Sequence, residues 1–319
     1  MTNKVLGIVF PGQGSQSVGM LADIAAQFNE VKQVFTQASD ALGYDLWRLV
    51  AEGPSTELDK TMHTQPALLA ASYAIWQILT SRTSIKPAMM AGHSLGEYTA
   101  LVCAKALDFS DGIKLVAARG QFMQEAVAPG VGAMAAIVGL DEAAVTAICK
   151  QAVASAKDIL SPANFNSIGQ IVVAGHKAAV ERAIALAKEQ GAKLAVLIPV
   201  SVPSHCQLMQ EAALRLANLL KTIPLHQPAM PILNNVDVMP YHSIESIRDG
   251  LIRQLYLPVR WVEIIQSFVK AGITQLIECG PGKVLTGLNK RIDKNLQLMT
   301  TSDLASLESL LKESERSAS

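Results

Sequence analysis

Short apolar runs alternate with longer segments of helical periodicity in the first part of the chain. Val5 to Phe10 is wholly apolar and stops at Pro11-Gly12, which is typical of a strand buried in a parallel sheet. A second short run of small and apolar residues covers residues 88–92. The periodicity predicts helices over Leu21–Leu42, Ala67–Leu79, Tyr98–Leu107 and Asp111–Ala126. Strands separated by helices in this way indicate an α/β protein with a parallel sheet.

The middle of the chain has a different order of elements. The pattern predicts strands over Ala133–Val138, Ile159–Phe165, Ile171–Ala174 and Lys193–Pro199, with helices over Asp141–Val153 and Lys177–Gln190. This order, β-α-β-β-α-β, is that of a ferredoxin-like unit. We therefore expect a ferredoxin-like small domain at residues 129–199, inserted into a large α/β domain formed by residues 1–128 and 200–319.

The last third of the chain carries fewer signals. A helix is expected over Leu208–Leu220, and short strands at Ile232-Leu233 and Gln275–Glu278. The second of these strands closes on the turn Cys279-Gly280-Pro281-Gly282. The final stretch, LESLLKESERSAS from Leu307 onward, is interpreted as a frayed polar tail.

Composition and charge narrow the class of protein. Half of the residues are hydrophobic and 17% are charged, which permits a large core and argues against disorder. Lys plus Arg equals Asp plus Glu at 27 each, whereas nucleic-acid binders usually carry a basic excess. Four widely spaced cysteines without a CxxC pair predict neither disulfides nor a zinc site. The first apolar run is too short for a signal peptide, and no stretch approaches the roughly 18 apolar residues of a membrane span. We therefore expect a soluble, cytoplasmic protein.

The segment Gly92-His93-Ser94-Leu95-Gly96 fits the pattern G-x-S-x-G between an apolar run and a predicted helix. In this context the motif forms a sharp strand-to-helix turn that exposes the serine hydroxyl, and the flanking glycines avoid side-chain clashes. The helix that follows directs backbone N–H groups toward a developing oxyanion. A glycine-rich turn with a capping serine is the alternative, but the flanking elements favour Ser94 as a nucleophile.

A serine nucleophile needs a base, and the chain has six histidines. His93 is next to Ser94 in sequence, but adjacent side chains at such a turn project apart. His205 follows a predicted strand end and precedes a helix, where catalytic loops collect. Taken alone, a histidine in such a place is more often an ordinary loop residue than a base, and no acidic residue nearby would orient it. The remaining histidines carry no local signal of catalysis: His63, His176, His226 and His242.

The first predicted strand leads into a glycine-rich segment, residues 11–19. A dinucleotide-binding fingerprint would need glycine at position 17, which is Ser17 here. A phosphate-binding P-loop would need Gly-Lys-Ser/Thr, and this segment has none. Nucleotide binding is therefore the weaker interpretation. A glycine-rich turn beside the nucleophile would instead supply a second backbone N–H to an oxyanion hole.

Arg119 lies on an apolar face of a predicted helix, among Leu115, Val116, Phe122 and Met123. An unpaired charge in such a place is costly, so the guanidinium needs a partner. A snorkelling side chain or an internal salt bridge would satisfy it. The other interpretation is a guanidinium that waits for a carboxylate on the substrate, which it would hold in bidentate geometry.

Together these motifs resemble the bacterial malonyl-CoA:acyl carrier protein transacylases of type II fatty-acid synthesis. The resemblance spans about residues 5–295, with the motifs in the same order. The segments that carry it are Phe10-Pro11-Gly12-Gln13-Gly14-Ser15-Gln16, Gly92-His93-Ser94-Leu95-Gly96-Glu97-Tyr98, Arg119-Gly120, Asn164-Phe165-Asn166-Ser167, Val202-Pro203-Ser204-His205 and Gly280-Pro281-Gly282. It implies an α/β-hydrolase-like large domain that carries an inserted ferredoxin-like small domain.

The resemblance also implies roles for single residues. Ser94 would be the nucleophile and His205 its base, while the backbone N–H groups of Leu95 and Gln13 would form the oxyanion hole. Arg119 would bind the malonyl carboxylate. The histidine of this family is oriented by a main-chain carbonyl, which here would belong to Gln254.

The activity implied is transfer of malonyl from malonyl-CoA to the phosphopantetheine thiol of acyl carrier protein, through a malonyl-serine intermediate. A serine esterase or thioesterase with the same turn is the alternative. No cofactor or metal is expected, because coenzyme A is part of the substrate and phosphopantetheine belongs to the acceptor. We expect a monomer that contacts neither nucleic acid nor membrane. The carrier is acidic, so basic residues are expected where it docks, with candidates Lys283, Lys290, Arg291 and Lys294. For any one of them, a place on a solvated helix face is the commoner role.

Overall fold

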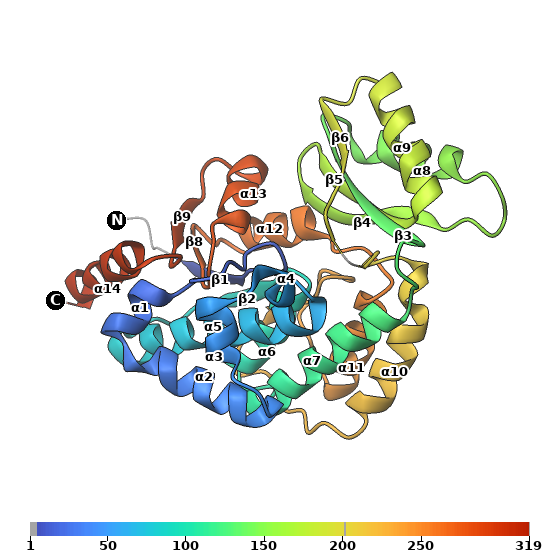
Figure 1. The fold of residues 1–319 in the computed structure, drawn as a ribbon. Coiled ribbons are helices and arrows are strands. Elements are labelled where there is room, and N and C mark those ends of the chain that lie inside the picture. Colours follow the sequence, from blue (N-terminus) through green and yellow to red (C-terminus); the bar gives the residue numbers. More distant parts are fainter. Residues whose placement is uncertain (1–4, 201, 319) are drawn as a thin grey trace.

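The strands form two separate sheets in the computed structural model, which describes residues 5–200 and 202–318 (Figure 1). The larger sheet has the strand order β7-β2-β1-β8-β9, and every neighbouring pair in it is parallel. Its strands are β1 (Leu6–Phe10), β2 (Met89–Gly92), β7 (Ile232–Leu233), β8 (Gln275–Glu278) and β9 (Gln297–Thr300). Short apolar strands of this kind are expected where both faces of a parallel sheet are covered.

Helices cover both faces of the large sheet, because side chains alternate along each strand. Ile8 and Phe10 of β1 point into the larger core, whereas Val9 joins a second core on the opposite face. The larger core receives side chains from α1 (Ala22–Gln27), α2 (Asn29–Leu42), α3 (Leu46–Glu52), α4 (Ser55–Leu58), α5 (Thr61–Arg82), α6 (Leu95–Cys103), α7 (Phe109–Glu125), α10 (Gln210–Leu220), α11 (Ile244–Gln254) and α14 (Leu304–Ala318). The second core is built with α12 (Trp261–Lys270) and α13 (Val284–Ile292).

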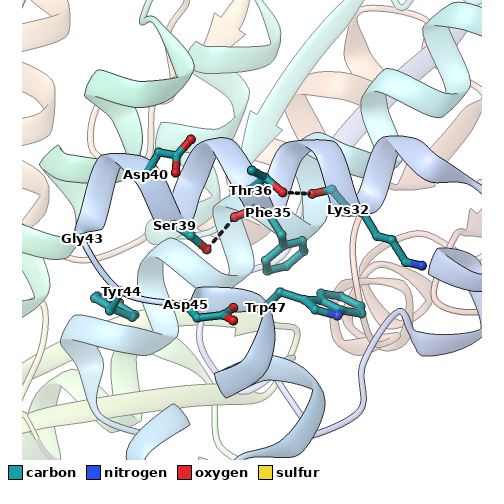
Figure 2. Close-up of a pocket in the computed structure, with 9 residues that line it drawn as sticks. All are labelled: Lys32, Phe35, Thr36, Ser39, Asp40, Gly43, Tyr44, Asp45 and Trp47. Atoms are coloured by element: carbon teal, nitrogen blue, oxygen red, sulfur yellow. Dashed lines mark hydrogen bonds between the residues drawn. The ribbon is translucent and has the colours of Figure 1, made fainter.

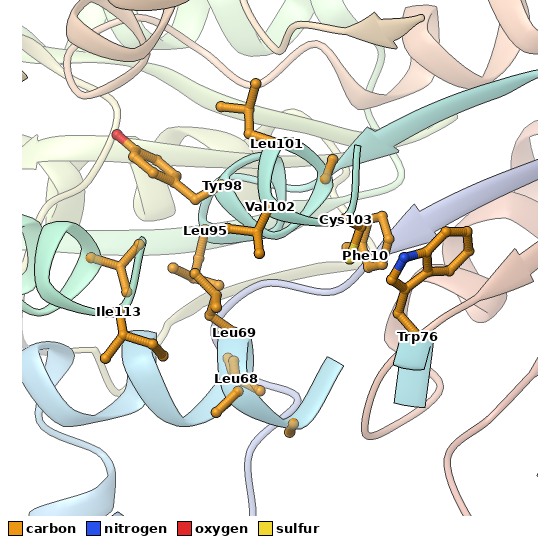
Figure 3. Packing of buried hydrophobic residues seen from close by; sticks show 14 of the residues in the cluster. Phe10, Leu68, Leu69, Trp76, Leu95, Tyr98, Leu101, Val102, Cys103 and Ile113 are labelled. Atoms are coloured by element: carbon orange, nitrogen blue, oxygen red, sulfur yellow. The ribbon is translucent and has the colours of Figure 1, made fainter. Parts of the chain in front are cut away.

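The helix α6 is central to the larger core. Its residues from Leu95 to Cys103 are all buried. Figure 3 shows them packed between β1 and the helices α5 and α7, with Phe10, Leu69 and Ile113 among the neighbouring side chains. A helix that is buried on all sides holds its first turn rigidly, and Ser94 stands at that first turn.

The smaller sheet is antiparallel and has the order β4-β5-β3-β6. Its elements are β3 (Gly132–Val138), α8 (Glu142–Ala152), β4 (Leu160–Ser167), β5 (Gln170–His176), α9 (Lys177–Glu189) and β6 (Leu194–Leu197). The helices α8 and α9 pack on one face around Ile137, Val145 and Val180. The fold class expected from the sequence, a parallel α/β domain with a small second domain, is confirmed. Residues 1–4, 201 and 319 of the expected large domain lie outside the described residues.

The C-terminal stretch is a helix, so its interpretation as a frayed polar tail is wrong. Leu307 and Leu310 are buried in the larger core, which gives α14 an apolar face. Asp303 accepts a hydrogen bond from the backbone N–H of Ser306, as a capping residue does at a helix start.

Other predicted elements differ in extent. The helix predicted over Leu21–Leu42 is divided at Phe28, which takes an extended conformation between α1 and α2. The helix predicted to reach Leu107 ends at Cys103, and Lys105 has a positive φ of 60°. A 3₁₀ turn, η1 (Gln207–Met209), precedes α10. The elements not predicted from the sequence are α3, α4, α11, α12, α13 and β9. Within the described ranges, no helix combines the length and apolar character that crossing a membrane requires.

Candidate active site

Ser94 occupies a strained turn between β2 and α6. Its φ of 51° and ψ of −106° lie where non-glycine residues rarely occur, as expected of a nucleophile elbow. The flanking glycines are required by close packing. A Cβ atom at Gly92 would lie 1.9 Å from the backbone of Gly96, and one at Gly96 would lie 2.1 Å from the carbonyl oxygen of Phe10. The turn is therefore pressed against the end of β1.

The glycine-rich loop after β1 lies against the same turn. A Cβ atom at Gly12 would lie 2.5 Å from the carbonyl oxygen of His93. Gln13 follows on this loop, where its side-chain amide is 3.5 Å from the hydroxyl of Thr61. Leu95 is the first residue of α6, and backbone N–H groups in a first helical turn have no partner within the helix. The structure thus packs Gly12, the residue before Gln13, against His93, the residue before Ser94, while Leu95 follows Ser94 directly.

His205 reaches Ser94 from the loop between the small sheet and α10. Its Nε2 accepts a hydrogen bond from the Ser94 hydroxyl at 2.8 Å, and its Nδ1 donates to the carbonyl oxygen of Gln254 at 2.6 Å. The Nδ1 contact fixes the tautomer that leaves Nε2 free to accept a proton. Burial, reinforced by the nearby Arg119 charge, lowers the pKa of His205 to about 3. The imidazole is therefore neutral at physiological pH, as a general base must be.

Arg119 is fully buried on α7, and its guanidinium faces Ser94. One Nη donates to Gln65 at 2.9 Å, and the other donates to Gln254 Oε1 at 2.9 Å and to Ser94 Oγ at 3.2 Å. Its Nε has no hydrogen-bond partner, and within the described residues it forms no salt bridge with a carboxylate. Burial lowers its pKa from the ordinary value. Neither a snorkelling side chain nor an internal salt bridge therefore describes Arg119.

A buried polar network that the sequence analysis missed lies beneath the turn. Glu97 accepts hydrogen bonds from the Tyr241 hydroxyl, from Gln254 Nε2 at 2.5 Å and from the backbone N–H of Asn235 at 3.3 Å. Asn235 Oδ1 accepts from the Ser94 N–H at 2.8 Å. Signals for these residues exist in the sequence: Glu97 is the one charged residue of α6, and Asn235 follows a buried strand.

His93 turns away from the nucleophile toward the small sheet. Its Nε2 lies 2.7 Å from Oδ1 of Asn166, which belongs to β4, and its ring is 5.5 Å from that of Trp261. Burial lowers its pKa. His93 therefore links the turn to the second sheet, and the expectation that adjacent side chains project apart is consistent with this geometry.

A separate hollow on the surface holds none of these residues. It lies between α2 and α3 and is lined by Lys32, Phe35, Thr36, Ser39, Asp40, Gly43, Tyr44, Asp45 and Trp47 (Figure 2). Arg119, His205 and Gln254 contact Ser94 instead. The described residues contain no cluster of His, Cys, Asp and Glu suited to a metal ion.

Known proteins similar in sequence to this chain match it over nearly its whole length. Residues 8–307 match the acyl transferase domain family. The malonyl CoA-acyl carrier protein transacylase of Haemophilus influenzae is 55% identical, over 96% of this chain and 98% of that protein. The Escherichia coli protein of the same name is 53% identical, over 95% and 98%.

Solved structures agree with these relatives. A crystal structure of an acyl carrier protein S-malonyltransferase from Vibrio cholerae superposes with a TM-score of 0.93 at 55% identity, covering 96% of this chain and 99% of that one. A malonyl-transacylase in complex with its type II polyketide synthase acyl-carrier protein gives a TM-score of 0.95 at 53% identity, covering 97% and 100%.

Proposed function

The chain belongs to the acyl transferase domain family, among the malonyl CoA-acyl carrier protein transacylases, and from this premise we propose how its own residues carry out malonyl transfer. The observation that carries the proposal is the contact of one hydroxyl with both an imidazole and a guanidinium. Ser94 Oγ lies 2.8 Å from an imidazole nitrogen and 3.2 Å from a buried guanidinium. Such an arrangement would set a nucleophile, a base and a carboxylate-binding cation around one bound acyl group.

The first half-reaction acylates Ser94. His205 Nε2 takes the hydroxyl proton while Ser94 Oγ attacks the thioester carbonyl carbon of malonyl-CoA, which forms a tetrahedral oxyanion. The C–S bond then breaks, and the departing coenzyme A thiolate receives the proton from His205. Such positioned general-base help is typically worth ~10²–10⁴-fold in rate.

The second half-reaction reverses these roles with a new thiol. The phosphopantetheine thiol of the carrier gives its proton to His205 and attacks the malonyl-serine carbonyl. The Ser94 oxygen leaves and recovers the proton, so the enzyme returns to its starting state in a ping-pong cycle. The carbonyl oxygen of Gln254, 2.6 Å from Nδ1, orients the imidazole in both halves.

We assign the oxyanion hole to the backbone N–H groups of Leu95 and Gln13. Support comes from the position of Leu95 at the first turn of α6 and from the packing of the Gly12 backbone against His93. One donor of this kind is typically worth roughly 10²–10³ in kcat.

Arg119 would select malonyl over uncharged acyl groups. A malonyl carboxylate bound near Ser94 would supply the anion that this buried guanidinium lacks among the described residues. Hydrogen bonds to charged groups contribute about 1.5–3 kcal/mol each, and a bidentate carboxylate makes two of them. Acetyl-CoA offers no such group.

Carrier protein is proposed as the acceptor because the polyketide relative is seen in complex with its own carrier. We also propose that no cofactor takes part, since exchange of an acyl group between thiols and a hydroxyl needs no electron transfer. A single chain is the proposed working unit, because one chain supplies Ser94, His205 and Arg119. The proposed place of action is the cytoplasm.

The fate of the acyl-enzyme separates this function from that of a serine hydrolase. Protein loaded with radiolabelled malonyl-CoA is freed from excess substrate and divided between buffer and buffer containing carrier protein. We expect the label to stay on the enzyme in buffer and to move to the carrier when it is present. Steady release of free malonate in both samples would support an esterase or thioesterase instead.

A further inference from the structure

Glu97 lies beneath the nucleophile, in the first turn of α6, and is fully buried. Each of its hydrogen-bond partners donates: the Tyr241 hydroxyl, the Gln254 amide nitrogen and the Asn235 backbone N–H. Surroundings made only of donors fit an ionised carboxylate, which is an acceptor without a proton of its own. We propose that Glu97 is a positioning residue whose negative charge sets the orientation of the Gln254 amide, and through it the alignment of Arg119 for malonyl. This inference rests on the proposed function.

The Gln254 side chain stands between a cation and an anion. Its Oε1 accepts from Arg119 Nη2 at 2.9 Å, and its Nε2 donates to Glu97 at 2.5 Å and to the Ser94 carbonyl oxygen at 3.0 Å. Rotation of the amide by half a turn would set its NH₂ group against the guanidinium and its oxygen against the carboxylate. Both contacts would then be repulsive. The charges on Glu97 and Arg119 therefore both favour the observed orientation of the amide.

One residue thus connects the base with the carboxylate-binding cation. The backbone carbonyl of Gln254 holds His205, while its side chain holds Arg119. Without the anion at position 97 the backbone contact would remain, because it comes from the end of α11, but the NH₂ group of the amide would lose its charged acceptor and the side chain would be held less firmly. Arg119 would lose alignment more than His205 would, so malonyl binding would suffer more than the chemical step.

The same carboxylate balances a buried charge. Arg119 has no salt bridge among the described residues, and Glu97 is one amide group away from it. Burial raises the pKa of Glu97 to about 7 against the effect of its donors, so an assay at pH 8 observes the ionised form.

The test compares acylation of Ser94 by malonyl-CoA and by acetyl-CoA at pH 8, in the wild type and in Glu97→Gln. The neutral amide keeps the size of the side chain but removes the charge. We expect KM for malonyl-CoA to rise about tenfold or more, kcat to change less, and the preference for malonyl over acetyl to fall by a similar factor, in line with the strength of charged hydrogen bonds.

Glu278→Gln is the matched control. Glu278 is also a buried glutamate that accepts only from donors, in its case Leu285 and Thr286 at the start of α13. Removing this buried charge should lower the melting temperature of the Glu278→Gln variant. Because Glu278 does not contact Gln254 or Arg119, we expect the variant to prefer malonyl over acetyl as strongly as the wild type does.

Two further variants keep the test decisive if Glu97→Gln does not fold. Glu97→Asp retains the charge and should recover part of the malonyl preference. Gln254→Met retains the backbone carbonyl that holds His205 but removes the amide, so it should lose the preference as Glu97→Gln does. A folded Glu97→Gln or Gln254→Met with the wild-type ratio of malonyl to acetyl acylation would overturn the inference. A wild type that forms no malonyl-enzyme would instead refute the proposed function, so the two failures are distinct.

Discussion

Arg119 is a buried cation among apolar side chains and amides. Its guanidinium carbon Cζ lies 5.1 Å from the centroid of the Tyr98 ring. Keeping a charge there costs free energy that neutral hydrogen bonds to Gln65 and Gln254 offset only in part. A site that retains such a charge gains when an anionic substrate enters. Arg119 is thus the residue through which we propose that the site selects its substrate.

We expect Arg119→Ala to reduce kcat/KM for malonyl-CoA by about 10- to 100-fold or more, because one or two charge-assisted hydrogen bonds are lost. Acetyl-CoA should be used about as well as before, since it has no carboxylate to lose. Steady-state rates with both donors measure the effect. Arg215→Ala removes an exposed arginine that pairs with Glu125, and should leave both rates unchanged. An equal fall with both donors in Arg119→Ala would show that the arginine is only structural.

At the scale of residues, sequence patterns found the groups that carry a chemical motif. The G-x-S-x-G motif identifies Ser94, and a charge among apolar neighbours on a predicted helix identifies Arg119. His205 has no comparable local signal and is identified as the base only by the family resemblance. Glu97 and Asn235 were missed because their roles depend on each other across 138 positions of sequence. No local pattern encodes such a contact.

At the scale of elements, the turn between β2 and α6 depends on the absence of side chains. The carbonyl oxygen of Phe10 occupies the space that a Cβ at Gly96 would need, 2.1 Å away. Both β1 and α6 are buried in the close-packed core, so neither can shift to make room for an added methyl group.

We therefore predict that Gly96→Ala lowers the free energy of unfolding by about 3 kcal/mol or more, at the upper end of overpacking costs. Gly287→Ala is the comparison, because nothing lies within 4 Å of a Cβ placed there on α13. That change should raise the free energy of unfolding by about 0.5–1 kcal/mol through lower chain entropy. Urea denaturation of both variants provides the measurement, and a Gly96→Ala protein as stable as the wild type would disprove the packing argument.

Elements with strong local signals were predicted well, and the errors have physical causes. The helix α8 was predicted from Asp141, and its first residue follows Asp141, whose side chain caps it. The helix α4 has only 4 residues, too few for periodicity to appear. The helix α12 does show apolar spacing at Trp261, Ile264, Ile265 and Phe268, so its omission was a missed signal. The α14 error came from weighing polar composition above the spacing of buried leucines.

At the scale of the whole molecule, the site depends on contacts between the two sheets. The β4 strand reaches the large domain through the bond between Asn166 and His93 and through a bridge between Asn164 and Val259. The sequence indicated a small inserted unit, but not which of its strands would face the nucleophile. That choice follows from tertiary packing of β4 against α12 and α13, which appear beside it in Figure 1.

The helix α13 also presents basic residues on the surface. Lys283 pairs with Asp303, and Arg291 donates to Gln170 of the small sheet at 2.5 Å, so both are engaged within the protein. Lys290 is exposed, which makes it the better candidate for contact with an acidic carrier.

We predict that Lys290→Glu raises the KM for carrier protein several-fold, and more at low ionic strength, with the KM for malonyl-CoA unchanged. Lys32→Glu makes the same change of charge on the exposed surface of α2 and should have little effect. Initial rates at varied carrier concentration decide the matter. If Lys290→Glu and Lys32→Glu had the same KM for carrier protein, α13 would not be part of the docking surface.

The central claim is that Ser94, activated by His205, holds the malonyl group between its two thiol carriers. Intact-mass spectrometry after incubation with malonyl-CoA alone tests it most directly. The account predicts a mass increase of one malonyl group in the wild type, its loss on addition of carrier protein, and no increase in Ser94→Ala. A wild-type protein that gains no mass, or a Ser94→Ala protein that gains it equally, would contradict the account.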